Sequence, residues 1–205
     1  AMSRVLVTGA NGFLGRYVCP RLTDSKTEVI AAVRAPVPDG LPSTAAVRIV
    51  GDIGPDTDWR EALNGVDAVV HMAARVHIMD GAPSDPDGIY RRTNTEGTTN
   101  LARQAVAAGV KRFVYVSSSS VYGVSDAPEV TEEHPLVPLT DYNTYKGLCE
   151  PLLFKHQSPD FTCVTIRPAT VCGYGPRLRL DLSVNILTNH AVTNNRITVF
   201  GGAQM

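Results

Sequence analysis

Short, continuously apolar runs alternate with helix-like stretches along most of the chain, and this alternation constrains the fold more than any other feature. Strands are expected at 4–8, 28–33, 46–50, 67–71, 112–117 and 161–167, with a short one at 197–200. Helices are expected at 12–24, 58–64, 85–108, 141–156 and 180–192. Strands that are apolar on both faces are typical of parallel sheets covered on both sides. The pattern therefore predicts an α/β fold, an open doubly wound parallel sheet with helices on both faces.

The composition argues against several classes of protein. The 205 residues carry 19 basic and 20 acidic side chains, which offers no electrostatic case for binding nucleic acid or an anionic membrane. No apolar run approaches the ~18 residues that a membrane span needs, and the N-terminus shows no signal-peptide pattern. The four cysteines form no CxxC pair and the five histidines have no metal-ligand spacing. We therefore expect reduced thiols, no metal and a cytoplasmic location.

A glycine-rich turn joins the first expected strand to the first expected helix. Its glycines have the spacing GxxGxxG, with a strand before them and a helix after them. Gly9 permits the tight turn, Gly12 lets a pyrophosphate approach the backbone, and Gly15 lets the helix pack closely on the sheet. This context predicts a Rossmann fold with phosphates at the helix N-terminus, although a turn can also need glycine for itself. The residues expected at the cofactor are Gly9, Asn11, Gly12, Phe13, Leu14, Gly15 and Arg16.

The choice between NAD and NADP depends on the end of the second strand. An acidic residue there normally accepts the ribose hydroxyls of NAD, but this chain has Arg34, which could pair with the extra phosphate of NADP. Arg16 could help, or both arginines are solvated surface. NADP is therefore favoured over NAD. After the third strand, Asp52 could accept the adenine amine and Ile53 could pack on the ring, or the pair is an ordinary loop cap.

A tyrosine, a lysine and a serine run suggest acid–base chemistry. Tyr142 and Lys146 lie four residues apart on an expected helix, so their side chains share one face. An ammonium near a phenol favours the phenolate, and Lys146 could also hold the nicotinamide ribose. The serine run 117–120 follows the fifth strand, at the sheet edge where ligands bind. A serine there could hydrogen-bond the substrate oxygen that Tyr142 protonates, or it only caps a polar strand end.

Together these motifs resemble the extended short-chain dehydrogenase/reductase family, the NAD(P)-dependent nucleotide-sugar epimerases and dehydratases. The resemblance is carried by TGANGFLG (8–15), GDI (51–53), DAVVHMAA (67–74), NTEGT (94–98), SSSSVYG (117–123), YNTYK (142–146) and RPATVCGYGP (167–176). It implies a nucleotide sugar as the small-molecule partner and a catalytic set of Ser118, Tyr142 and Lys146. It implies further cofactor contacts from Met72, Ala73, Ala74, Arg75, Asn94, Ser117, Pro168, Ala169 and Thr170.

The resemblance also narrows the reaction. The family's 4,6-dehydratases carry an Asp-Glu pair where this chain has Ser119 and Ser120, and serine is a poor acid or base without a partner. We therefore expect these serines to line the substrate and water elimination to be absent. The remaining reaction is hydride transfer at C4 with Tyr142 as acid and base, in a UDP-sugar 4-epimerase or an NADPH-dependent 4-keto-sugar reductase. A cofactor-binding redox sensor or an inactive relic is the alternative of another class.

Family members continue into a smaller substrate domain, of which this chain is expected to hold only part. We expect an NAD(P)-binding domain at 1–176 and a partial substrate-binding segment at 177–205. Arg177, Arg179 and Asn185 are candidate contacts to phosphate and sugar, or surface side chains on a loop. Because the family usually dimerises through the tyrosine-bearing helix and the helix before it, the resemblance also implies a homodimer.

Overall fold

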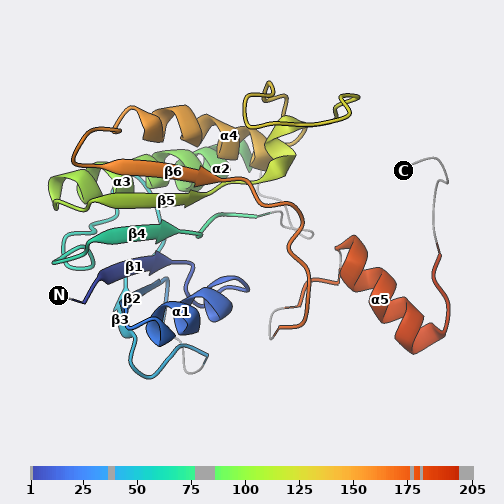
Figure 1. Cartoon of the computed structure of the whole chain (residues 1–205), viewed down its shortest axis with the longest axis horizontal. Coiled ribbons are helices and arrows are strands. Elements are labelled where there is room, and N and C mark those ends of the chain that lie inside the picture. Colours follow the sequence, from blue (N-terminus) through green and yellow to red (C-terminus); the bar gives the residue numbers. More distant parts are fainter. Residues whose placement is uncertain (1, 37–39, 77–85, 176–177, 181, 199–205) are drawn as a thin grey trace. The chain divides into compact units, whose positions relative to one another are not determined.

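Six parallel strands form the sheet of this protein (Figure 1). The computed structural model describes residues 2–36, 40–76, 86–175, 178–180 and 182–198. The strands are β1 (Arg4–Thr8), β2 (Glu28–Val33), β3 (Ala46–Ile49), β4 (Ala68–His71), β5 (Arg112–Val116) and β6 (Thr162–Ile166). Their order is β3-β2-β1-β4-β5-β6, and every pairing is parallel. The predicted doubly wound sheet is confirmed, and the winding changes direction between β1 and β4, where such sheets bind ligands.

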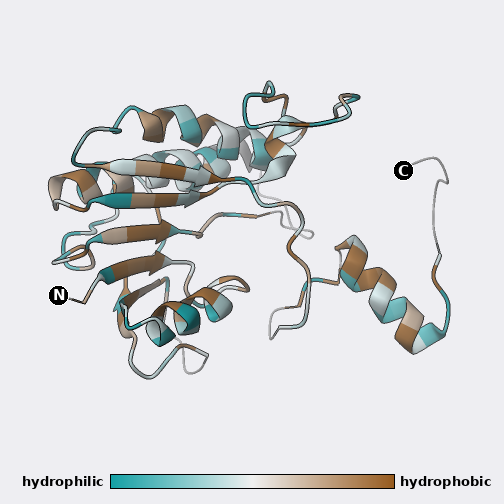
Figure 2. Cartoon of the chain, in the orientation of Figure 1, coloured by the Kyte–Doolittle hydropathy of each residue, from teal (hydrophilic) through white to brown (hydrophobic). Residues whose placement is uncertain are grey.

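Helices cover the two faces of the sheet through separate apolar cores. The helices are α1 (Gly15–Asp24), α2 (Pro86–Tyr90), the π-helix η1 (Arg91–Gly97), α3 (Thr98–Ala107), the 3₁₀ helix η2 (Ser119–Tyr122), α4 (Asp141–Phe154) and α5 (Ser183–Asn194). Val5 and Val7 of β1 share one core with Cys19 of α1. Leu6, between them, shares the other core with Leu101 of α3 and with α4 residues. Figure 2 shows how strongly apolar residues concentrate in the strands, as expected for a sheet covered on both sides.

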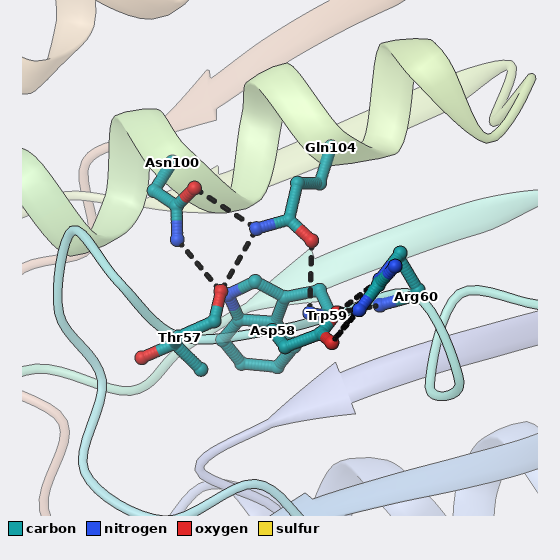
Figure 3. Close-up of polar contacts among 6 residues, drawn as sticks. All are labelled: Thr57, Asp58, Trp59, Arg60, Asn100 and Gln104. Carbon is teal, nitrogen blue, oxygen red and sulfur yellow. Dashed lines mark hydrogen bonds and ion pairs between the residues drawn. The ribbon is translucent and has the colours of Figure 1, made fainter.

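The helix expected at 58–64 is wrong, because side chains of α3 bind that segment instead (Figure 3). The backbone N–H of Trp59 donates to Gln104 Oε1 at 2.9 Å, and the Thr57 carbonyl accepts from Gln104 Nε2 at 2.8 Å and from Asn100 Nδ2 at 2.9 Å. One bond with α-helical spacing remains, from Leu63 N to Trp59 O at 2.9 Å. The segment therefore forms turns and buries Trp59 completely in the core.

The helix expected at 85–108 forms as a continuous run of three pieces, with η1 in the middle. A π-helix is uncommon and usually accompanies a functional or structural constraint. Here Asn94 is buried and brackets Arg75, accepting from its N–H at 2.7 Å and donating to its carbonyl at 3.0 Å. At the end of η1, Gly97 faces Ile53 and Gly54, where a Cβ would overlap the Ile53 side chain. The wide turn thus lets one helix both hold the loop after β4 and pack on the loop after β3.

The chain divides into two compact units, 1–169 and 170–205. The first contains the whole sheet, and the second contains α5. The strand expected at 197–200 is absent at Ile197 and Thr198, and its last two residues lie outside the described ranges. The expected boundary between the NAD(P)-binding domain and the substrate-binding segment, at 176/177, stays a prediction. Among the described residues, no helix has the length and apolar character that crossing a bilayer requires.

Candidate active site

The glycine-rich turn has the shape that a dinucleotide needs. Gly9 has a φ of 68°, a conformation that favours glycine, and its carbonyl accepts from Gly12 N at 2.9 Å. A Cβ on Gly15 would overlap the carbonyl oxygens of Gly9 and Ala10, so only glycine lets α1 begin so close to the turn. Leu14, at the N-cap of α1, makes no capping hydrogen bond through its side chain. The Arg16 and Tyr17 N–H groups already donate to the Gly12 and Leu14 carbonyls, at 3.2 and 3.0 Å, so a phosphate would bind at the turn before them. The close approach that Gly9 and Gly15 allow at this turn fits the cofactor.

The loop after β4 borders this turn. A Cβ on Gly9 would lie 3.0 Å from the backbone nitrogen of Ala73, so the two loops touch. Asn94 holds the next part of the loop at Arg75, as described above. Predicted cofactor residues from both loops therefore meet at the carboxyl edge of β1 and β4. Those that are half-buried here are Asn11, Gly12, Phe13, Leu14, Arg16, Met72, Ala73, Ala74 and Arg75.

The two arginines predicted to choose the cofactor are Arg16, in the first turn of α1, and Arg34, directly after β2. Arg16 Nε donates to the Asn11 carbonyl at 3.2 Å, and its guanidinium fills the space that a side chain on Gly40 would need. Arg34 Nη1 lies 3.7 Å from Asp52 Oδ1, but both side chains are largely exposed, so this pair is weak. Ile53 is half-buried and packs on the protein core, and its contact with adenine stays a prediction.

Tyr142 and Lys146 lie one turn apart at the start of α4. Thr140 caps this helix, its Oγ1 accepting from Asn143 N at 3.3 Å. Tyr142 is half-buried, whereas Lys146 is 2% exposed. Lys146 Nζ donates to the Val116 carbonyl at 2.7 Å, at the end of β5, and lies 4.7 Å from the centre of the Tyr115 ring. Burial lowers the pKa of Lys146 to about 8, against the opposing effect of Cys149 and Glu150.

The serine run after β5 is joined by hydrogen bonds to α4, the helix that carries Tyr142. Ser118 Oγ caps η2 by accepting from Ser120 N at 3.2 Å, and it lies 2.6 Å from Ser120 Oγ. Ser120 Oγ donates in turn to Asn143 Oδ1 at 2.6 Å. Asn143 adjoins Tyr142, so this chain of hydrogen bonds links Ser118 to the tyrosine's own segment. The Ser119 N–H donates to the Pro168 carbonyl at 3.0 Å, which brings the end of β6 to the same place.

A buried ion pair supports the site from behind, and sequence reasoning missed it. Glu150 accepts from Ser117 Oγ at 2.6 Å and from Arg167 Nε at 3.1 Å through each carboxylate oxygen. Arg167 also donates to the Tyr122 hydroxyl and to the Glu132 carbonyl. The signal was available, because Glu150 continues the four-residue spacing of Tyr142 and Lys146 along α4. A cavity of about 860 Å³ adjoins this pair, lined by residues that include Ser119, Tyr122, Glu150, Phe154 and Arg167.

The second unit contains the predicted substrate contacts Arg177, Arg179 and Asn185. Asn185 is buried, its Oδ1 accepting from Gly173 N at 3.1 Å and its Nδ2 donating to the Arg179 carbonyl at 2.8 Å. Its amide therefore holds the backbone of the preceding loop. Thr170 and Arg179 are exposed, and Arg177 lies outside the described residues.

Comparison with known proteins places the chain in a family. Residues 5–205 match the model of the NAD dependent epimerase/dehydratase family. UDP-glucose 4-epimerase of Vibrio cholerae is 37% identical over 186 residues, covering 87% of this chain and 54% of the relative. A 3-beta-hydroxysteroid dehydrogenase of Mycolicibacterium neoaurum is 32% identical over 202 residues, covering 92% of this chain and 53% of the relative. The chain thus spans about half the length of the curated relatives it matches.

A solved structure agrees with this assignment. UDP-glucuronic acid 4-epimerase from Bacillus cereus, in complex with UDP-glucuronic acid and NAD, superimposes with a TM-score of 0.75 at 27% identity, covering 97% of this chain and 66% of that one. The family match, the relatives and the doubly wound sheet agree with the resemblance seen in the motifs. The chain therefore belongs to the NAD dependent epimerase/dehydratase family, of the extended short-chain dehydrogenase/reductase type.

Proposed function

We propose that this chain forms the cofactor-binding and catalytic part of an enzyme that transfers hydride at C4 of a nucleotide sugar, as a UDP-sugar 4-epimerase. The observation that supports this best is the setting of Lys146. Its ammonium is buried at the end of β5, one helical turn from Tyr142, and is anchored to the Val116 carbonyl at 2.7 Å. A buried cation is costly for packing alone, and the four-residue spacing places it on the same helix face as Tyr142, where a positive charge would lower the pKa of a phenol that must exchange protons.

Each residue of the catalytic set has a separate task in this proposal. The nicotinamide, when bound, supplies and accepts the hydride. Tyr142 takes the proton from the sugar hydroxyl and returns it, while Lys146 stabilises the phenolate. Ser118 hydrogen-bonds the same sugar oxygen and holds it in reach of the phenol.

The serines in place of an acidic pair favour this reaction over dehydration. Elimination of water needs an acid and a base beside Ser118. The Ser120 hydroxyl instead donates to Asn143 Oδ1 at 2.6 Å, so its proton is already engaged within the protein. Ser119 and Ser120 are then left to shape the sugar site rather than to move protons.

The cofactor preference that we propose is NADP, which also keeps the 4-keto-sugar reductase as a second candidate. In this proposal Arg16 and Arg34 face the adenosine and its extra phosphate, and the pair of Arg34 with Asp52 is exposed and therefore weak. The Bacillus cereus structure contains NAD, so this preference needs its own test. Dissociation constants of NADPH and NADH should favour NADPH, and Arg34→Asp should reverse the order. Arg48→Ala, on the neighbouring strand, is the matched control and should change neither. Equal affinities in the wild type would contradict the preference.

Turnover is tested by following the conversion of UDP-glucose, UDP-galactose and UDP-glucuronic acid to their C4 epimers by proton NMR. An epimerase returns the hydride to the sugar, so the absorbance of the reduced nicotinamide shows no net change and reports only the reductase alternative. Tyr142→Phe should abolish the conversion, because it removes the acid–base group. Tyr145→Phe, on the same helix and equally half-buried, is the matched control and should retain it. Firm cofactor binding without turnover of any sugar would favour the redox sensor instead.

We also infer a cytoplasmic location and a homodimer. All four cysteines are free thiols, three of them buried, which suits a reducing compartment. The outer side of α4 exposes Leu148 and Phe154, apolar residues that a partner helix could cover. Sedimentation of the purified chain tests the dimer, and a monomer at micromolar concentration would contradict it.

A further inference from the structure

We infer that His71 is a positioning residue of the cofactor site, and that its ring nitrogen orients the Thr8 hydroxyl so that one oxygen holds both loops that border the dinucleotide. Thr8 and His71 lie inside the glycine-rich turn motif and the motif at 67–74, which give neither residue a role of its own. The inference rests on the proposed function only for the identity of the ligand, because the hydrogen bonds that carry it lie within the chain.

The side chains form a buried line across the sheet. His71 ends β4, is 1% exposed, and places Nδ1 2.7 Å from Thr8 Oγ1 and Nε2 2.8 Å from Thr98 Oγ1. Thr8 ends the neighbouring strand β1, and Thr98 begins α3. The imidazole also stacks on Tyr115 of β5, with ring centres 6.0 Å apart. Both ring nitrogens and both threonine hydroxyls are therefore shut off from solvent and must satisfy one another.

The direction of each hydrogen bond follows from Thr8. Its Oγ1 accepts from the backbone N–H of Met72 and of Ala73, each at 3.2 Å. A hydroxyl has two lone pairs and one hydrogen, so with both lone pairs engaged the Thr8 O–H must donate to His71 Nδ1. The ring hydrogen then sits on Nε2 and is donated to Thr98 Oγ1. The neutral Nε2–H tautomer is thus the form that satisfies every group in the line.

This line ends where the cofactor is expected. Thr8 directly precedes Gly9, whose turn touches Ala73. The Thr8 oxygen therefore connects the glycine-rich turn to the loop after β4, and His71 keeps that oxygen pointed at the two N–H groups. Without an acceptor at Nδ1, the hydroxyl hydrogen would have to turn toward Met72 or Ala73 and displace one of their bonds. The gap between the two loops would then no longer be held at the width that the dinucleotide needs.

The tautomer can be measured directly. In a spectrum that correlates the imidazole nitrogens with their carbon-bound protons, wild-type His71 should show hydrogen on Nε2 and a bare Nδ1 at neutral pH. The Thr8→Val variant should lose this pattern, because it removes the donor to Nδ1. Hydrogen on Nδ1 in the wild type would overturn the inference.

Cofactor affinity separates positioning from ordinary packing. Measured with NADPH and NADH, His71→Leu and Thr8→Val should each raise the dissociation constant about tenfold, the size expected for one lost hydrogen bond. The double variant His71→Leu,Thr8→Val should bind the cofactor no more weakly than either single variant, because both substitutions remove the same Thr8–His71 hydrogen bond. Thr8→Ser keeps the hydroxyl and should bind normally. Thr98→Val breaks only the far end of the line, so it should lower the melting temperature but leave the affinity within about twofold.

Other outcomes are equally decisive. Should His71→Leu fail to fold, His71→Asn offers a carbonyl oxygen near the position of Nδ1 and should restore binding. The positioning role would be refuted if the folded His71→Leu protein, or the folded double variant His71→Asn,Thr8→Val, bound the cofactor with wild-type affinity. It would also be refuted if Thr98→Val lost as much cofactor affinity as His71→Leu. Failure of the wild type to bind either cofactor is a different result, since it would overturn the cofactor site itself.

Discussion

Two arginine–carboxylate pairs in this protein have similar geometry but very different surroundings, and we predict that only one of them matters for stability. Arg167 and Glu150 have side chains that are 18% and 3% exposed. Arg60 and Asp58 approach to 2.6 Å, but their side chains are 86% and 56% exposed. Breaking a buried pair leaves a charge in a poorly solvated place, whereas water replaces the partner at an exposed pair.

The size of the effect follows from the partners that remain. Glu150→Gln keeps the volume and an oxygen for Ser117 but leaves the Arg167 guanidinium without a counter-charge, a loss of ~3–5 kcal/mol for a fully buried pair. Arg167 keeps its bonds to the Tyr122 hydroxyl and the Glu132 carbonyl, so we expect the lower end, about 3 kcal/mol. Glu150→Leu also strands the Ser117 hydroxyl and should cost about 1–3 kcal/mol more. Asp58→Asn should leave stability unchanged.

Urea unfolding measures this difference, with Trp59 as the probe. It is the one tryptophan of the chain and is completely buried, so its fluorescence reports loss of the core. With a slope of about 2 kcal/mol per molar urea, Glu150→Gln should move the midpoint down by about 1.5 M. The pair Glu150→Leu,Arg167→Met should recover part of the loss, because no unpaired charge remains. Equal midpoints for Glu150→Gln and Asp58→Asn would refute the reasoning.

Three further predictions follow from burial and close contact. Burial lowers the pKa of His71 to about 3, so below about pH 6.5 the unfolded chain binds a proton that the folded chain does not. The free energy of unfolding should therefore fall from about pH 6.5 toward pH 3, by at most about 1.4 kcal/mol per pH unit. Urea titrations of His71→Asn should lack that contribution. Burial lowers the pKa of Lys146 from 10.5 to about 8, so the folded chain loses this proton at a lower pH than the unfolded chain does. The free energy of unfolding should therefore rise between pH 8 and pH 10.5 in the wild type but not in Lys146→Met. A rise of equal size in the variant would show that another group causes it. Gly15→Ala should weaken NADPH binding by at least about tenfold because its methyl group would overlap the Gly9 carbonyl oxygen, whereas Gly147→Ala, with its nearest neighbour 3.6 Å away, should bind normally in the same titration.

The parts of the fold that could be predicted are those set by local pattern. The bounds of β1 and β2 agree with their apolar runs, and the glycine spacing located the turn and the start of α1 to within a few residues. The segment 58–64 failed because its structure depends on Gln104, far away in the chain, which binds the backbone at Trp59. Propensity alone cannot anticipate such a partner.

The candidate site divides along the same line. The spacing of Tyr142 and Lys146 could be recognised because a helix repeats every turn. The link from Ser120 to Asn143 spans 23 residues and could be found only in the packed structure. The four-residue spacing also marked Glu150, but its partner Arg167, 17 residues away, could not be identified without that structure. The roles of the site residues stay predictions until the variants above are measured.

The π-helix between α2 and α3 limits how the chain can change in length. Each N–H in such a helix reaches five residues back rather than four, so the turn holds a surplus residue. Deleting Thr95 would let the run close as an ordinary α-helix and would rotate Asn94 by about 100° relative to α3. The shortened helix would survive, but Asn94 would release Arg75 and the loop after β4 with it. A single-codon loss there would thus leave the scaffold intact and loosen the ligand site.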